Sequence, residues 1–209
     1  MSTAILQTTY FGPIQWYQKL HRFDHCMIEQ YDSYQKQTYR NRCLIATANG
    51  VQALTVPVEH NDDKMLVKDL RISDHNQWRR IHWNALQSAY SESPFFEYYA
   101  DDIRPFFEKR YEFLVDFNEA IRQVICRLID IQPEVAYTSA YNRQWPEPTD
   151  YREVIHAKHP QTDSDFEPRQ YWQVFQHKLG FLPNLSILDL LFCMGPESIF
   201  YLNIKPLNN

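Results

Sequence analysis

The pattern of apolar and polar positions predicts a β-loop-α-β opening. Residues 4–8 form a short apolar run, the loop 10–13 follows, and Pro13 suits the first position of a helix that continues to about Phe23. Cys26-Met27-Ile28 is typical of a second strand. We expect the two strands to pair in parallel, which places the loop 10–13 at a carboxyl end of the sheet, where ligands bind in open α/β folds.

A hairpin follows. Two apolar runs, 43–46 and 51–58, flank the dipeptide Asn49-Gly50, which favours a type I′ turn. Residues 67–72 add the pattern of another strand, which we expect to end at Ser73-Asp74.

The period then changes from two residues to 3.6, which predicts three helices. Ser73 or Asp74 can cap the first, which runs to about Tyr90. The second begins at Ser93-Pro94 and is ended or kinked by Pro105, and the third covers about 112–129. The apolar faces are formed by Trp78, Ile81, Ala85, Leu86 and Ala89 in the first helix, and by Leu114, Phe117, Ile121, Ile125 and Leu128 in the third.

The last part of the chain begins with a polar, proline-rich stretch over 132–169, which we interpret as an extended loop or lid, at 142–169 above all. Beyond it, Ser186 can cap a helix over 187–193, Gly195 can close that helix, and Pro196 can start a last one. We therefore predict one domain over 1–209 of class α+β, or α/β-like. Its opening and hairpin would form a mixed sheet, packed against the three helices and a C-terminal helical pair.

Composition excludes several classes of protein. Hydrophobic residues make up 44% of the chain, enough for a sizeable core. The four glycines, at 12, 50, 180 and 195, lie too far apart for a dinucleotide fingerprint or a P-loop, and we expect no cofactor. The net charge is −5 with scattered Lys and Arg, which disfavours nucleic acid as a partner. No signal peptide or long apolar run is seen, so we expect a cytoplasmic protein without membrane insertion.

His82 is the first candidate for chemistry. It lies in the centre of the apolar helix face around Trp78 and Leu86, and imidazole is the side chain that exchanges protons near pH 7. The alternative is a core histidine bound to a backbone carbonyl.

A second group of candidates precedes the hairpin. Arg40 and Arg42 would point to the same face of a strand, with Asn41 opposite, and their guanidinium forks suit a carboxylate or phosphate. Lys36 could extend this positive site, and Tyr10 would line its mouth. The alternative is an edge strand whose two charges face water.

Two other chemistries are weaker. The pairs His21/His25 and His156/His159 have ligand-like spacing, but they fall at a helix end and in a loop, so surface histidines explain them better than a metal site. Of the cysteines, Cys43 follows two arginines, which would lower its pKa, and it could act as a nucleophile with His82 as base. Cys193 lies in a strongly apolar helix, where an inert thiol is expected.

These landmarks, taken together and in order, resemble the WbqC-like protein family. The resemblance is carried by the following segments: Tyr10-Phe11-Gly12-Pro13, Tyr39-Arg40-Asn41-Arg42, Leu54-Thr55-Val56-Pro57-Val58, Trp78 with His82-Trp83, Pro94-Phe95-Phe96 and the segment 182–192. It implies a bacterial protein of surface-polysaccharide (O-antigen) biosynthesis, and it favours His82, Asn41, Arg42 and Asp189 as functional residues. The chain departs from the family's pattern at Cys43 and Cys193, which weakens a thiol mechanism. It also departs from that pattern at Gly12.

The leading hypothesis is a transferase that moves an acyl or aminoacyl group to the amine of a nucleotide-linked sugar. His82 would be the base, and Arg40, Arg42 and Lys36 would hold anionic groups. Asp189, in the C-terminal helix, could orient His82 or the amine. The alternatives are a non-catalytic ligand-binding or scaffold protein of the same pathway and a hydrolase that uses Cys43. The sequence gives neither the substrate nor the oligomeric state.

Overall fold

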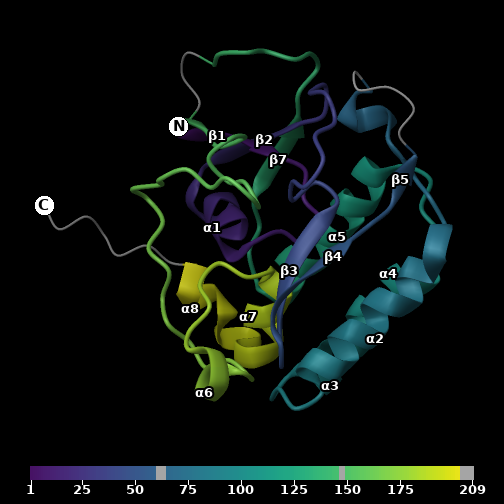
Figure 1. Cartoon of the computed structure of the whole chain (residues 1–209). Helices are drawn as coiled ribbons and strands as arrows, with labels where there is room; N and C mark the ends of the chain where they lie inside the picture. The colour runs from purple at the N-terminus through teal and green to yellow at the C-terminus, as the bar shows by residue number, and fades with distance from the viewer. Residues whose placement is uncertain (60–64, 146–148, 203–209) are drawn as a thin grey trace, which may run out of the picture.

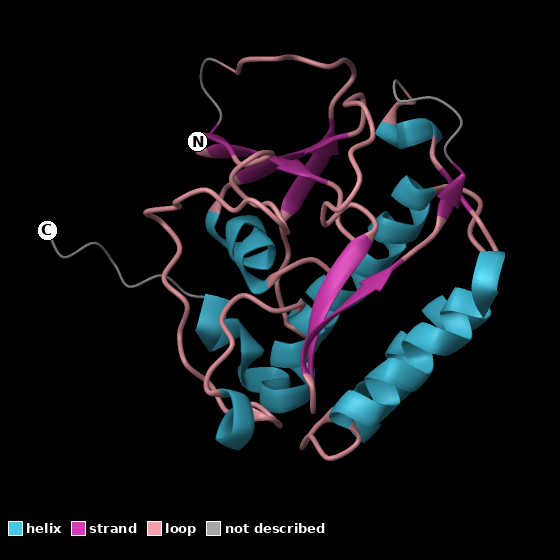
Figure 2. Ribbon diagram, viewed as in Figure 1, coloured by secondary structure: helices cyan, strands magenta, loops and turns pink. Residues whose placement is uncertain are grey.

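A four-stranded parallel sheet forms one end of the molecule in the computed structural model, which describes residues 1–59, 65–145 and 149–202 (Figures 1 and 2). Its strands, in spatial order, are β7 (Glu134–Tyr137), β2 (His25–Glu29), β1 (Thr3–Gln7) and β8 (Thr149–Asp150). All three neighbouring pairs are parallel. The chain thus has the mixed α+β class predicted.

The predicted β-loop-α-β opening is confirmed. Helix α1 (Ile14–Arg22) connects β1 to β2, and the two strands pair in register from Thr3 opposite His25 to Gln7 opposite Glu29. Pro13 is the residue before the helix rather than its first residue. In β1 the side chains from Ala4 to Gln7 are all buried, as expected for a central strand of a parallel sheet.

Strands β7 and β8 lie inside the interval that the sequence suggested was loop. β7 pairs with β2 along four residues, whereas β8 pairs with β1 through only two, Thr149 and Asp150. The chain therefore builds the sheet outward from β1 through β2 to β7 and then crosses to the other side of β1. The connections change direction between β1 and β8, which is the place where open α/β sheets usually form a crevice.

The predicted hairpin is present but stands apart from the parallel sheet. It consists of β3 (Arg42–Thr47) and β4 (Gly50–Thr55), with Thr47 opposite Gly50. The type I′ turn over Asn49-Gly50 is wrong, since that turn needs positive φ at both residues and only Gly50 has it, at 109°. Ala48 and Asn49 form the loop instead.

The strand predicted for 67–72 is mostly absent. Val67–Asp69 form a 3-10 turn, and only Arg71–Ile72 are extended, as β6 beside β5 (Val58–Glu59). The apolar side chains of this segment are buried all the same, because Val67 and Leu70 face the core from the turn and its end.

The three predicted helical regions are found with shifted starts. α2 (Trp78–Tyr90) begins after a 3-10 turn (His75–Gln77), so Ser73 and Asp74 do not cap it. Asn76 and Gln77, the last two residues of that turn, have positive φ and interrupt the helical path before α2. Pro105 divides the second region into α3 (Phe96–Ile103) and α4 (Pro105–Glu108). The third is α5 (Leu114–Leu128), whose predicted stripe is buried except that Leu128 is half-exposed.

The C-terminal helices also agree with the pattern. The described part contains α6 (Gln176–Leu179), α7 (Ile187–Met194), a 3-10 turn (Gly195–Glu197) and α8 (Ser198–Leu202). The Ser186 hydroxyl accepts a hydrogen bond from the Leu188 amide and so caps α7 as predicted. No helix in the described ranges has the length and apolarity to cross a lipid bilayer.

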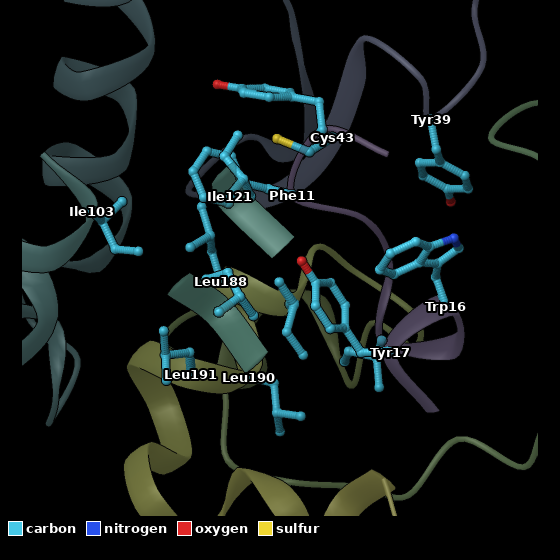
Figure 3. Close-up of a cluster of buried hydrophobic side chains, with 14 of the residues drawn as sticks. Phe11, Trp16, Tyr17, Tyr39, Cys43, Ile103, Ile121, Leu188, Leu190 and Leu191 are labelled. Atoms are coloured by element: carbon cyan, nitrogen blue, oxygen red, sulfur yellow. The ribbon is translucent and has the colours of Figure 1, made fainter. Parts of the chain in front are cut away.

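The core extends through the whole of this arrangement, and α7 is at its centre. Leu188, Leu190 and Leu191 are fully buried, and α7 contacts α1, α3 and β3. Figure 3 shows these leucines among aromatic side chains from the β1–α1 segment, including Phe11, Trp16 and Tyr17. The β1–α1 loop is thus fixed by packing on both sides.

Candidate functional site

Two of the predicted residues, Tyr10 and His82, meet in the interior. The Tyr10 hydroxyl lies 2.9 Å from Nδ1 of His82, although 72 positions separate them in the chain. Tyr10 is held by the loop after β1, where its amide donates to the carbonyl of Tyr39. His82 projects from the buried face of α2. This hydrogen bond joins the carboxyl end of the parallel sheet to the helical layer.

The backbone of this loop is unusual. Phe11 adopts a φ of 41°, in the left-handed region that bulky residues avoid. Gly12 follows, packed so closely on Thr9 that a Cβ there would overlap the threonine hydroxyl. The Ser186 hydroxyl donates to the Phe11 carbonyl at 2.8 Å. Packing and this hydrogen bond hold the strained residue directly beside Tyr10, and such strain concentrates at functional positions.

His82 is neutral at physiological pH. Its exposed fraction is 4%, and burial lowers its pKa to about 4. Its ring packs against Trp78 with centroids 5.1 Å apart and lies 6.5 Å from Phe107. A hydrogen bond with the backbone of Thr55 opposes the effect of burial and makes the ring the donor there. Burial raises the pKa of Tyr10, so its hydroxyl keeps the proton that it donates to Nδ1.

Thr55 connects this pair to the surface. It lies opposite Arg42 in the hairpin, and its exposed hydroxyl accepts a hydrogen bond from Nε of Arg42 at 3.0 Å. Contacts therefore run from Tyr10 through His82 and Thr55 to Arg42. The sequence analysis did not select Thr55, although a hairpin with its turn at residues 48–49 would have placed it opposite Arg42.

Arg40 and Arg42 do not share a strand face as predicted, because β3 begins only at Arg42. The Arg40 guanidinium is buried, with 2% exposed, and pairs with Asp32 at 2.5 Å. Asn41 donates from its side chain to the carbonyl of Val56. Tyr34 interacts with all three: its side chain bonds Asn41, and both guanidiniums lower its pKa, which burial raises overall. Lys36 is exposed.

Asp189 has partners other than the predicted His82. Its carboxylate accepts hydrogen bonds from Tyr90 at 2.8 Å, from Tyr171 at 2.6 Å and from the Gln173 amide at 2.8 Å. Among the described residues, none of its hydrogen bonds goes to His82. Burial raises the pKa of Asp189, and the three donors oppose this effect. Tyr90, which binds Asp189, lies two helical turns after His82 in α2. Asp189 and His82 therefore belong to separate hydrogen-bonded clusters.

The carboxyl end of the sheet, where the topology predicts a ligand crevice, is occupied by the protein's own charges. Glu29 at the end of β2 is fully buried and pairs with Arg152 just beyond β8, at 3.1 Å. Arg152 also binds Asp150 at 2.7 Å, and Thr138 donates to Glu29. No sequence pattern points to this cluster, because Glu29 and Arg152 are isolated charges in segments with no visible motif.

The amino end of α1 is also occupied. The Ile14 amide donates to the carbonyl of Leu185, and the Gln15 amide donates to the side chain of Asn184. These are the groups that hold phosphate in a dinucleotide-binding fold. Here a segment from the C-terminal part of the chain takes their place, in keeping with the absence of a glycine-rich loop.

The surroundings of Cys43 do not favour the cysteine alternative. Cys43 is buried, and burial raises the pKa of its thiol strongly, opposite to the lowering expected from the neighbouring arginines. Nδ1 of His156 accepts hydrogen bonds from the Lys158 and His159 amides at 3.0 Å each. In the part of the chain that the structure describes, no cluster of three or more His, Cys, Asp or Glu residues is arranged to hold a metal ion.

Comparison with known proteins agrees with the family resemblance. The chain is 29% identical over 225 residues to the uncharacterized protein Rv1507c of Mycobacterium tuberculosis, an alignment that covers 95% of this chain and 96% of that protein. No solved structure matches the present chain. The model of the WbqC-like protein family matches residues 7–162, which include Tyr10, the segment 36–42 and His82. The chain belongs to the WbqC-like protein family.

Proposed function

We propose that this protein is a transferase of bacterial surface-glycan biosynthesis, active in the cytoplasm. It would transfer an acyl or aminoacyl group to the amine of a sugar nucleotide. The observation that carries the proposal is the hydrogen bond between Tyr10 and His82. Two proton-transferring groups that are remote in sequence are brought together beside a strained loop.

The proposed reaction is attack of the sugar amine on an activated carbonyl, such as a thioester. A C–N bond forms, the C–S bond breaks, and the thiolate leaves. His82 is neutral at physiological pH, and Nδ1 is its one ring nitrogen with a lone pair, because the other nitrogen donates a proton to Thr55. Nδ1 therefore takes the proton of the Tyr10 hydroxyl while the Tyr10 oxygen takes the proton that the amine loses. Arg42 and Lys36, which are half-exposed and exposed, would hold anionic groups of the substrate. Arg40 would not contact the substrate. It would keep Asp32 and Tyr34 in position instead.

The approach to His82 runs past Thr55 and Arg42. Thr55 is exposed and hydrogen-bonded to both residues, so a movement of this end of the hairpin would give a substrate access to the ring. The proposal therefore includes such a movement on binding. Asp189 is assigned no contact with the substrate in this reaction, since its carboxylate holds three buried donors.

A non-catalytic ligand-binding protein of the same pathway is the second candidate. The observation that favours it is the burial of His82, which is 4% exposed and bonded at both Tyr10 and Thr55. In that case the pair serves stability, and only the exposed cations meet the ligand.

Tyr10→Phe tests the two candidates against each other. It removes the hydroxyl and keeps the ring, so the variant should fold. We expect transfer from acyl thioesters or aminoacyl donors to amino-sugar nucleotides, followed by mass spectrometry, to fall at least 100-fold, in the range typical of a lost acid–base group. Arg127→Gln, on the exposed side of α5, serves as the matched control. Full turnover by Tyr10→Phe would exclude the mechanism, and the absence of turnover by the wild type on every donor would favour the binding protein.

A further inference from the structure

A groove of about 360 Å³ lies between α2 and α4, and none of the residues that line it is among the candidate site residues above. Its walls carry Arg79, Arg80 and Trp83 from α2, and Phe107 and Glu108 from α4, with Arg104 at the junction of α3 and α4. The two helices pack against each other. The volume is within the range of small-molecule sites, which runs from about 300 to about 1,000 Å³.

The groove carries an excess of positive charge. Three arginines and one glutamate line it, in a chain whose net charge is −5. Arg104 pairs with Glu108 at 2.6 Å, both well exposed, whereas Arg80 is exposed and has no carboxylate within ion-pair distance among the described residues. At least one guanidinium is thus free to bind an anion.

Arg79 is the third cation. One end of its guanidinium pairs with Asp74, and the guanidinium stacks on Trp78 at 4.6 Å. Its Nε is buried and has no hydrogen-bond partner in the structure. Arg79 lines the groove, and Asp74 and Trp78 hold its guanidinium in place there.

Flat apolar surface lies beside these charges. Trp83 is half-buried, and its ring lies 5.7 Å from that of Phe107 at an angle of 39°. Trp83 is further supported by Phe96, with stacked rings 5.9 Å apart. An aromatic wall next to guanidinium forks is the combination that suits a planar ring attached to a phosphate group.

We propose that the groove between α2 and α4 binds a nucleoside diphosphate, with the diphosphate on Arg79, Arg80 and Arg104 and the base against Trp83 and Phe107. A nucleic acid is a poorer fit, since a polyanion needs an extended basic face and this chain is acidic overall. This site is separate from Arg42 and Lys36, which the proposed reaction assigns to anionic groups of its substrate, and the assignment holds whether or not His82 takes part in that reaction. The groove is connected to that residue, because Phe107 packs against both Trp83 and His82.

Calorimetric titration of the full chain with UDP, ADP, uridine and pyrophosphate tests the assignment. We expect UDP and ADP to bind more tightly than uridine or pyrophosphate, and more weakly as NaCl is raised, because the contacts are ionic. Arg80→Gln and Arg104→Gln should each raise Kd about tenfold, the usual effect of one charge-assisted hydrogen bond. Arg127→Gln, which removes an exposed arginine outside the groove, should leave Kd unchanged.

The assignment would be overturned by no binding of UDP or ADP by the wild type, by unchanged Kd in both arginine variants, or by equal affinity for uridine and UDP. Equal affinity for pyrophosphate and UDP would remove the aromatic wall from the site and so reject a nucleoside ligand. The Tyr10→Phe variant separates this inference from the proposed reaction. It should bind nucleotide like the wild type even where transfer is lost, and nucleotide binding that depends on Arg80 and Arg104 would stand even if Tyr10→Phe were fully active.

Discussion

At the scale of single residues, His82 shows what a helical wheel can and cannot give. Its place on the buried face of α2 was predictable from the spacing of Trp78 and Leu86. Its partner was not, because Tyr10 lies 72 residues away and no local pattern connects the two. Asp189 was selected from its matching segment in the family, yet the fold surrounds it with Tyr90, Tyr171 and Gln173. The candidate residues could thus be selected from the sequence, whereas their hydrogen-bond partners could not.

The depressed pKa of His82 makes stability depend on pH. The unfolded chain protonates this ring near the ordinary value of 6.5, whereas the folded protein does so only near 4. Between these two pKa values the unfolded state binds more protons than the folded state, so the free energy of unfolding falls as pH falls through this window. The stability that neutral His82 contributes is fully present above the window. From about pH 7 to about pH 5 we expect His82 to lower it by about 2 kcal/mol.

Urea denaturation of the wild type and His82→Gln at both pH values measures this effect. The variant lacks the titrating group, so its free energy of unfolding should fall less than that of the wild type, by about 2 kcal/mol. Parallel pH dependence in the two proteins, or an NMR titration of the His82 ring near its ordinary pKa, would contradict the prediction.

At the scale of elements, long amphipathic segments were predictable and short strands were not. The stripe of α5 and the cap of α7 follow from local chemistry, and both are confirmed. β8 contains two residues, and it is a strand only because β1 lies beside it. Pairing of this kind is a tertiary effect, so a polar, proline-rich segment can supply a strand without a local signal. A tertiary contact also places Arg40, which lies before the start of β3 and whose guanidinium pairs with Asp32.

Ser186 connects two elements, and its removal should weaken both. Its hydroxyl accepts from the Leu188 amide at the start of α7 and donates to the carbonyl of Phe11 in the β1–α1 loop. We expect Ser186→Ala to lower the free energy of unfolding by about 1–2 kcal/mol, the usual cost of losing an N-cap in a buried setting. Chemical denaturation measures it. Ser88→Ala, on the exposed face of α2, is the control and should change stability by less than about 0.5 kcal/mol. Equal effects in the two variants would show that the cap contributes nothing.

At the scale of the whole molecule, the sheet is closed by charges that belong to the chain. In an open α/β fold the crevice between β1 and β8 would hold a ligand, and the amino end of α1 would hold its phosphate. Here Glu29 and Arg152 occupy the carboxyl edge, and Asn184 and Leu185 bind the amides of α1. The candidate chemistry is therefore displaced toward α2 and the hairpin, where Tyr10, His82 and the arginine-lined groove lie.

The ion pair between Glu29 and Arg152 spans the sheet, since Glu29 ends β2, Arg152 follows β8, and β1 lies between these strands. Arg152→Ala would leave the fully buried Glu29 without its cation, and we expect a loss of about 3–5 kcal/mol in the free energy of unfolding. The double variant Glu29→Gln/Arg152→Met carries no unpaired buried charge and should recover a large part of that loss. Arg104→Ala, which breaks an exposed pair, should cost less than about 1 kcal/mol. Urea denaturation of the four proteins decides the matter: if Arg152→Ala were no more destabilising than Arg104→Ala, the pair would not hold the sheet together, and the carboxyl edge would again be a candidate for a ligand.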